Sequence, residues 1–270
     1  MSIVQVNEQT CTKCGVCVST CQLGFIDMKE GEYPCQVSES ERCATCGICA
    51  AICPNGSIEH QYMPLETLPS INPSLKVNFD QMSQLLKSRR SIRAYKNTPV
   101  PREVLTSLID AVRYAPTAGN MQEVKWLVID DAERLKRLRE VGAKFWIESL
   151  KKVPNYDEVV DIFIKRKESG YDIIFHSAPA VVVTYAEENN TMASIDCTIA
   201  LSYFDLAANS VGLGCCWLGF FSFDANNYPP IKEMIALPDG YQFYGCMTVG
   251  YPKYHFSRIP LRNSSDITWR

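Results

Sequence analysis

Two cysteine blocks near the start of the chain constrain its fold more than any other feature. The stretch CTKCGVCVSTC begins at Cys11, and CATCGICAAIC repeats its spacing 32 residues later, from Cys43. Both blocks follow the pattern C-x2-C-x2-C-x3-C, and Ile26, beyond the first block, returns as Ile58. The chain has 13 cysteines and opens on MSIVQVNEQ, which does not resemble a signal peptide. Such a cysteine content in a cytosolic chain favours metal or redox chemistry over a disulfide framework.

The spacing of each block is that of bacterial iron-sulfur ligation, in which three close thiolates hold one 4Fe-4S cluster and the fourth ligates the other cluster. A pair of structural zinc sites is the alternative, although tetrahedral zinc has no use for the repeated third and fourth cysteines. Cys35 lies outside the pattern, and we expect a small buried or surface thiol there rather than a ligand. The rule predicts two interlocked ligand sets: Cys11, Cys14, Cys17 and Cys53 for cluster one, and Cys43, Cys46, Cys49 and Cys21 for cluster two.

The composition is that of a soluble globular protein, with 46% hydrophobic and 21% charged residues among 270. No apolar run reaches the roughly 18 residues of a membrane helix, so we expect a cytoplasmic protein with no membrane partner. Residues 1–60 carry seven acids against three bases, and the basic residues of the chain form no stripe. We therefore expect no nucleic-acid partner.

The chain divides by composition into a cysteine-dense segment at 1–60, a linker at 61–76 that contains three prolines, and a domain at 77–270. In the last part, apolar residues recur at helical spacing after Pro101. KWLVID, PAVVVTY and YGCMTVG are β-rich runs, and residues 191–210 predict a central buried helix that ends at VGLG. The pattern is that of a domain containing both helices and strands.

Three separated segments of this last part favour FMN as a cofactor. RRSIRAY groups Arg89 and Arg93 around a hydroxyl, a combination that holds phosphate. APTAGNMQ offers Thr117 and Asn120 to a polar ring edge, and GLGCCWLGF would bring a strand end against the cofactor. Taken singly, the basic cluster could be a solvated helix end, and the strand could be packed with Cys215–Cys216 as core thiols.

The first 60 residues resemble bacterial-type two-cluster ferredoxins, with Cys53–Pro54 as expected and Gln22 where proline is usual. From about residue 80 to the end, the chain resembles the nitroreductase family of flavoproteins. The motifs R-R-S-x-R, A-P-[ST]-x-x-N-x-Q, G-L-G-x-x-W-x-G and G-Y-P occur in that order. The resemblance implies an α+β fold, with a small ferredoxin-like domain followed by a mixed sheet flanked by helices, and a homodimer with FMN at its interface.

The resemblance also implies a set of cofactor contacts. Because the flavin performs the redox chemistry in such proteins, no catalytic side chain is predicted. His60, His176 and His255 are scattered, and we expect structural roles for them. The implied FMN contacts are Arg89, Arg90, Ser91 and Arg93 at the phosphate and ribityl, Pro116, Thr117, Ala118 and Asn120 beside the isoalloxazine, Leu218 and Gly219 at its other edge, and Arg258 in SRIP as a further phosphate ligand.

Residues 142–171 vary in length among nitroreductase relatives, which predicts a cover over the flavin. Phe145, Trp146 and Phe163 would stack on an aromatic substrate or form the apolar face of an amphipathic helix. No G-x-G-x-x-G motif follows a strand, so a Rossmann domain is not expected.

These features predict an FMN-dependent oxidoreductase in which two 4Fe-4S clusters pass electrons to FMN, which reduces a nitroaromatic, a quinone or an activated double bond. The donor would be a ferredoxin, a flavodoxin or NAD(P)H, and oxygen-labile clusters suggest an anaerobic host. An alternative is an electron-transfer flavoprotein whose client is another redox protein. A flavin pocket open to small molecules would favour the enzyme. A redox sensor is a third hypothesis, which the lack of a DNA-binding signal disfavours.

Overall fold

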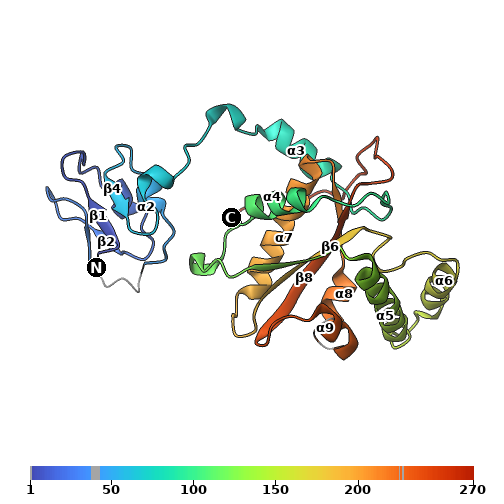
Figure 1. The fold of residues 1–270 in the computed structure, drawn as a ribbon. Coiled ribbons are helices and arrows are strands. Elements are labelled where there is room, and N and C mark those ends of the chain that lie inside the picture. Colours follow the sequence, from blue (N-terminus) through green and yellow to red (C-terminus); the bar gives the residue numbers. More distant parts are fainter. Residues whose placement is uncertain (1, 38–42, 225, 227) are drawn as a thin grey trace. The chain divides into compact units, whose positions relative to one another are not determined.

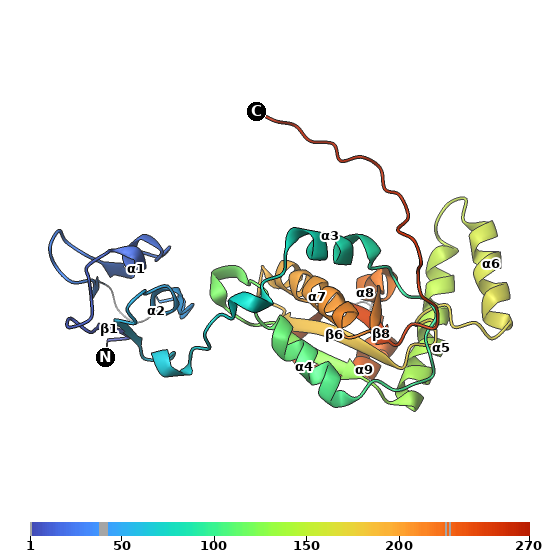
Figure 2. The ribbon, with the colours of Figure 1, turned by 90° about the horizontal axis from the view of Figure 1, so that it is seen from above.

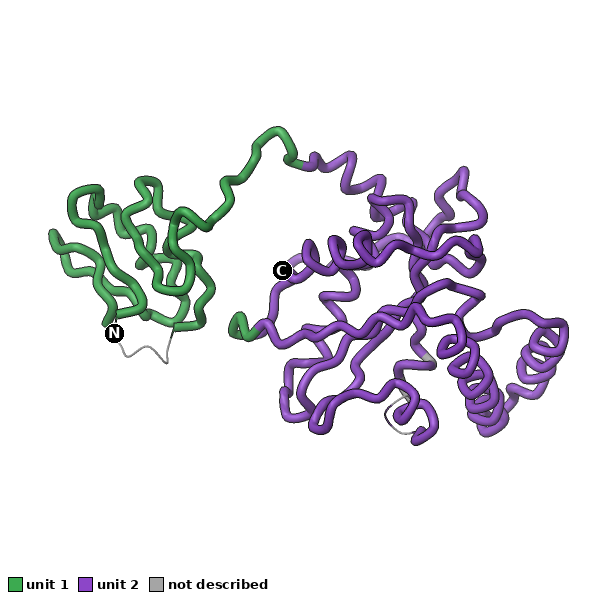
Figure 3. Tube along the Cα trace, in the orientation of Figure 1, with its two compact units in different colours: residues 1–76, 119–121 green, residues 77–118, 122–270 purple. Residues whose placement is uncertain are grey.

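The computed structural model describes residues 2–37, 43–224, 226 and 228–270. The chain divides into two compact units, shown in Figure 3: residues 1–76 with 119–121, and residues 77–118 with 122–270. The predicted linker groups with the first unit and contains two short 3-10 turns, η2 at Leu65–Thr67 and η3 at Pro73–Leu75. Among the described helices, none has the length and apolarity to cross a membrane.

Among its described residues, the first unit contains two small antiparallel sheets and two one-turn helices (Figure 1). Strand β1 (Val4–Val6) pairs with β4 (Ile58–His60), and β2 (Ile26–Asp27) pairs with β3 (Cys35–Gln36). The helices are α1 (Val16–Ser19) and α2 (Ile48–Ala51). Its small core contains Ile3, Val4, Cys17, Phe25, Ile26, Ala50 and Ile58.

The sequence repeat of the first unit is also a repeat of backbone conformation. Helices α1 and α2 each begin directly after a glycine in the left-handed region, which has no Cβ to clash there. Three pairs of residues that lie 32 positions apart share a positive φ: Lys13 and Thr45 (57° and 49°), Gly15 and Gly47 (71° and 68°), and Gly24 and Gly56 (60° and 59°).

The second unit is built on a four-stranded sheet in the order β5-β6-β8-β7, whose neighbouring strands are antiparallel. The strands are β5 (Lys125–Ile129), β6 (Ala180–Glu187), β7 (Gly214–Trp217) and β8 (Tyr241–Gly250). The runs KWLVID, PAVVVTY and YGCMTVG are therefore confirmed as strands. Central strand β6 is apolar almost throughout because helices cover both of its faces.

Helices cover the sheet in two layers, as Figures 1 and 2 show. One layer contains α4 (Arg102–Val112) and α7 (Ala193–Ser210), which pack on Val182 and Met247, and α3 (Phe79–Ser88) beside α7. The other contains α5 (Ala132–Leu150), α8 (Gly219–Asp224) and α9 (Pro229–Ile235), which pack on Val181 and Val183. Both long predicted helices are confirmed, since α4 follows Pro101 and α7 lies within residues 191–210.

The predicted cover segment forms most of a helical hairpin. Helix α6 (Asp157–Glu168) packs against the end of α5 through a small core that includes Ile147, Val160 and Ile173. After β8, residues 253–270 are exposed throughout and run away from the body of the second unit, as Figure 2 shows.

Candidate functional site

Four thiols of the predicted cluster-one set lie around one small cavity in the first unit. Cys11, Cys14 and Cys17 from the first block line it together with Cys53 from the second block. The Cys53 sulfur accepts a hydrogen bond from the backbone N–H of Ser57 at 3.2 Å. A thiolate ligand needs such donors, because they stabilise negative charge on sulfur.

The predicted cluster-two set shows the corresponding arrangement. Burial, together with the nearby sulfurs of Cys46, Cys43 and Cys21, raises the pKa of the Cys49 thiol to about 11. Cys21 accepts from the backbone N–H of Phe25 at 3.2 Å, which repeats the Ser57 bond of the other block. A thiol that resists ionisation in this way becomes a thiolate when a metal coordinates it. The donor set therefore fits an iron-sulfur cluster.

Within the residues that the structure describes, no three His, Cys, Asp or Glu side chains are arranged to hold one metal ion. Cys35 is exposed on β3.

His60 lies against the second cysteine block, although the sequence suggested only a structural role. It is 2% exposed, and its Nε2 lies 3.8 Å from the sulfur of Cys43. Burial lowers the pKa of the imidazole below its ordinary value. The sequence contained one signal for this position. The 32-residue repeat aligns His60 with Met28, so the histidine occurs in only one of the two repeats.

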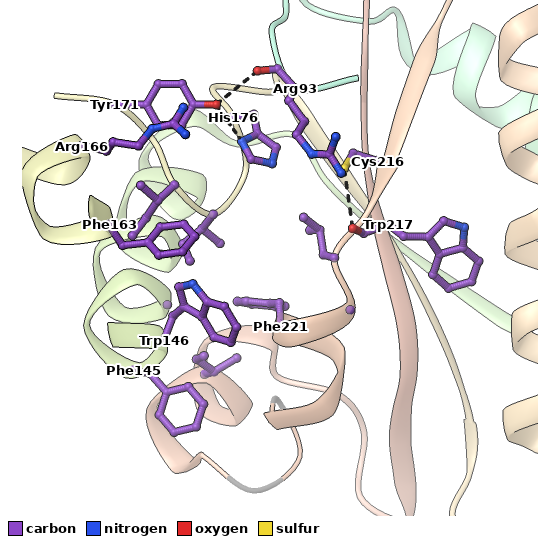
Figure 4. A pocket seen from close by; sticks show the side chains of 16 residues that line it. Arg93, Phe145, Trp146, Phe163, Arg166, Tyr171, His176, Cys216, Trp217 and Phe221 are labelled. Atoms are coloured by element: carbon purple, nitrogen blue, oxygen red, sulfur yellow. Dashed lines mark hydrogen bonds between the residues drawn. The ribbon is translucent and has the colours of Figure 1, made fainter. Parts of the chain in front are cut away.

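A cavity of about 480 Å³ lies in the second unit, at the end of β7 and beneath the helical hairpin (Figure 4). Three predicted FMN contacts line it: Arg93, Leu218 and Gly219. A mainly apolar cavity with a few polar groups at one side is the usual form of a cofactor or ligand site. Its aromatic walls are Phe145, Trp146, Phe163, Tyr171, Trp217 and Phe221.

The predicted cover segment supplies one wall of this cavity. Phe145 stacks on Tyr228 with ring centroids 4.2 Å apart, and Trp146 meets Phe163 edge to face at 6.2 Å. These rings therefore pack between helices and also face the cavity. A role in helix packing is thus compatible with a role in stacking on an aromatic substrate. Arg166 of the same segment lies over the ring of Tyr171, at 4.1 Å from its centroid.

His176 belongs to the cavity as well, although the sequence predicted only a structural role for it. Its ring points into the cavity in Figure 4, and its Nδ1 lies 3.2 Å from the Tyr171 hydroxyl. His176 and Ser177 have φ values of 55° and 62°, a strained conformation for residues with a side chain. The Asp172 carboxylate holds this turn by accepting from the backbone N–H groups of Ile174, Phe175 and Ser177 at 2.9 to 3.0 Å.

Electrostatics keep the His176 ring neutral. Burial lowers its pKa, and the nearby cations of Arg93 and Arg166 lower it further, against an opposing effect of Asp172. The neutral ring has one N–H donor and one acceptor nitrogen. It can therefore bind an acceptor oxygen without adding charge.

Two of the predicted FMN segments meet at β7. The backbone N–H of Ile92, within RRSIR, donates to the carbonyl of Cys215 at 2.8 Å. Burial raises the pKa of the Cys216 thiol, which lines the cavity, while Arg93 and Ser91 act in the opposite direction. The loop is thus fixed to the strand that leads to Leu218.

Arg89 has a partner inside the protein. Its Nη1 donates to Asp205 of α7 at 2.8 Å, and the two side chains are 27% and 8% exposed. Burial raises the pKa of the Asp205 carboxyl in spite of the adjacent guanidinium. Arg89 therefore ties the loop to α7 with one of its nitrogens, and Arg90 and Ser91 are half-buried beside it.

The remaining FMN candidates do not lie at this cavity. Thr117 lines a separate cavity of about 350 Å³, and the Ala118 N–H donates to both carboxylate oxygens of Asp196 at 3.2 Å. Pro116 is exposed, and Asn120 groups with the first unit. Arg258 is exposed in the segment after β8. Their contacts with FMN stay predictions.

Comparisons with curated proteins agree with this arrangement. The chain is 29% identical over 183 residues to an FMN reductase [NAD(P)H] of Bacillus subtilis, which covers 66% of this chain and 70% of that protein. It is 27% identical over 201 residues to an NADH dehydrogenase of Thermus thermophilus, covering 67% and 92%.

Solved structures share the fold of the second unit. A nitroreductase from Bacteroides fragilis with bound FMN matches with a TM-score of 0.58 at 21% identity, over 72% of this chain and 100% of that one. A nitroreductase from Desulfitobacterium hafniense with bound FMN matches with a TM-score of 0.57 at 21% identity, over 72% and 99%.

Two families account for nearly all of the motifs described above. Residues 10–58 match the 4Fe-4S dicluster domain, and residues 86–251 match the nitroreductase family. The chain therefore belongs to the nitroreductase family of oxidoreductases, with a 4Fe-4S dicluster domain preceding the family fold.

Proposed function

We propose that this protein is an FMN-dependent oxidoreductase that takes up electrons through two 4Fe-4S clusters and reduces a small organic acceptor. Nitroaromatics, quinones and activated double bonds are the acceptor classes. The observation that carries the proposal is the aromatic cavity beside Arg93, Leu218 and Gly219, in a chain that also carries a dicluster domain. When bound, FMN exchanges electrons singly with the clusters and delivers two to the acceptor.

The residues present fit a phosphate-bearing planar cofactor. None of the ion pairs among the described residues involves Arg93, so its guanidinium is available to an anion. Ser91 adds a hydroxyl from the same loop, and Leu218 and Gly219 place backbone at the cavity wall. Arg89, held by Asp205, fixes the position of the loop and has further donors for the phosphate.

The cavity also favours a class of acceptor. Its charged lining side chains are the two cations Arg93 and Arg166, and the lining set of the described cavity contains no carboxylate. Because Arg93 faces the cofactor region, Arg166 is left for an anionic group on an aromatic acceptor. The neutral His176 ring can hydrogen-bond an acceptor oxygen. In a nitro reduction the substrate gains two electrons and two protons and releases water to give a nitroso product.

A homodimer would complete the flavin site. The FMN candidates of one chain form two separate groups, one at the cavity and one beside Asp196 of α7, as a site shared between two copies requires. Apolar side chains are exposed on α7 and on the segment after β8, including Ile195 at 53% and Leu261 at 97%. A second copy of the chain would bury such groups.

The alternative is an electron-transfer flavoprotein with a protein client. The acidic character of residues 1–60 favours it, because charge patches steer protein encounters. The size of the cavity favours a small acceptor instead.

The test compares the full chain with a variant that lacks residues 1–60, under anaerobic conditions. FMN content is measured first, and flavin reduction is then followed with a reduced ferredoxin and, separately, with NADPH. The proposal requires the truncation to slow reduction by ferredoxin severely while FMN stays bound. Equal rates for both proteins with their best donor would show that the clusters are not the entry point for electrons.

A further inference from the structure

The hydrogen bonds of the His60 ring define which of its nitrogens carries the proton. The backbone N–H of Tyr62 donates to Nδ1 at 3.3 Å, so Nδ1 acts as an acceptor and holds no proton. A neutral imidazole then has its proton on Nε2. Nε2 is the atom that lies 3.8 Å from the sulfur of Cys43. The ring is therefore set to donate an N–H···S hydrogen bond to a predicted ligand of cluster two.

The first cysteine block has no such donor at the equivalent place. Residue 60 corresponds to residue 28 in the 32-residue repeat, and residue 28 is a methionine. Its side chain lies at the first block, since its methyl carbon is 3.3 Å from the point where a Cβ on Gly15 would be. A thioether lies at the second block as well, since Met63 approaches Gly47 as Met28 approaches Gly15. The backbone donors are not identical either: Cys53 and Cys21 accept equivalent bonds, but the Lys13 N–H also donates to the Cys11 sulfur at 3.4 Å. The feature particular to the second block is the imidazole N–H of His60 beside Cys43.

We propose that His60 tunes cluster two through its hydrogen bond to Cys43, and that this bond raises the reduction potential of cluster two. Each cluster gains one electron and one negative charge on reduction. A hydrogen bond to a ligand sulfur stabilises the more negative, reduced state, which raises the potential. This inference rests on the proposed function, because it requires both clusters to be present.

The experiment is a redox titration of the full-length protein, followed by the EPR signals of the reduced clusters, with dithionite as the reductant. Two separate one-electron steps are expected for the parent protein. His60→Met, which introduces the residue of the equivalent repeat position, should lower the potential of one step, that of cluster two, and leave the other step in place. Because clusters one and two share a molecule, the unshifted step is an internal control.

A second variant protects the test against loss of structure. His60→Gln keeps an N–H donor and should shift the cluster-two step down by less than His60→Met does, at an unchanged iron content. Unaltered steps in His60→Met, or equal shifts of both steps, would overturn the inference while the clusters themselves remain. Failure of the parent protein to hold iron and acid-labile sulfide would instead overturn the proposed function.

Discussion

The two units of this protein encode their sites in different ways. The eight thiols of the predicted cluster sets lie between residues 11 and 53, and their spacing alone groups them into two sets. The cavity of the second unit takes its lining from residues as far apart as Arg93 and Ile231. A site defined by local spacing can be recognised in a sequence, whereas a site assembled from distant segments needs the fold. The same difference predicts how each unit responds to substitution.

The largest effect should follow from removing cluster ligands. Cys11→Ala should lower the iron content from roughly eight to about four atoms per chain, because one cubane is lost. Cys11→Ala with Cys53→Ala should lose no more, since both residues belong to the cluster-one set. Cys11→Ala with Cys21→Ala should lose nearly all iron, because each cluster then lacks a ligand.

Iron and acid-labile sulfide are measured on anaerobically purified protein, with FMN per chain as the control from the second unit. Complete loss of iron in the Cys11/Cys53 double variant would contradict the interlocked assignment. Loss of FMN in any of the three variants would show that FMN binding in the second unit depends on the clusters of the first.

An intermediate effect is expected at Arg89, whose partner lies more than a hundred positions away in sequence. Arg89→Ala should lower the free energy of unfolding by about 2–3 kcal/mol, because it leaves the buried Asp205 carboxylate without a cation. The folded-state pKa of Asp205 is already above the ordinary value of a carboxyl group, and loss of Arg89 raises it further. The destabilisation should therefore be full at neutral pH and diminish as the pH falls to where the carboxyl is protonated in both states.

Denaturant unfolding at several pH values measures this effect. The double variant Arg89→Ala with Asp205→Asn should recover part of the stability and lose the pH dependence. Arg93→Ala is the matched control in the same loop: we expect it to weaken FMN binding by about 1.5 kcal/mol or more without changing stability. A stability loss at Arg93 equal to that at Arg89 would remove the distinction between the two arginines.

The smallest effect concerns the acceptor. Arg166→Gln should lower kcat/KM for 4-nitrobenzoate by about tenfold and leave 4-nitrobenzamide nearly unchanged, because only the carboxylate pairs with the guanidinium. Lys165→Gln, an exposed neighbour on α6 that does not line the cavity, is the control. Equal losses for both acceptors would assign Arg166 a role in packing against Tyr171 instead of in charge recognition.

The sequence predicted the long elements of the second unit and the grouping of the thiols, since both depend on residues close together in the chain. It also identified RRSIR and GLGCCWLG, which the fold brings together at β7. It did not anticipate the partner of Arg89, because Asp205 lies on a helix whose position depends on the whole sheet. For His176 it predicted only a structural role, because the direction of the ring depends on a turn held by Asp172.

The exposure of Cys35 has a practical consequence. Of the thirteen cysteines, eight belong to the predicted cluster sets, and Cys197, Cys215, Cys216 and Cys246 are buried in the second unit. Burial raises the pKa of each of these four thiols, which suppresses the thiolate that reacts with alkylating reagents. In protein with both clusters assembled, a maleimide should therefore label Cys35 selectively. That single attachment point would allow the native protein to be wired to a gold electrode in one orientation, with no cysteine added or removed.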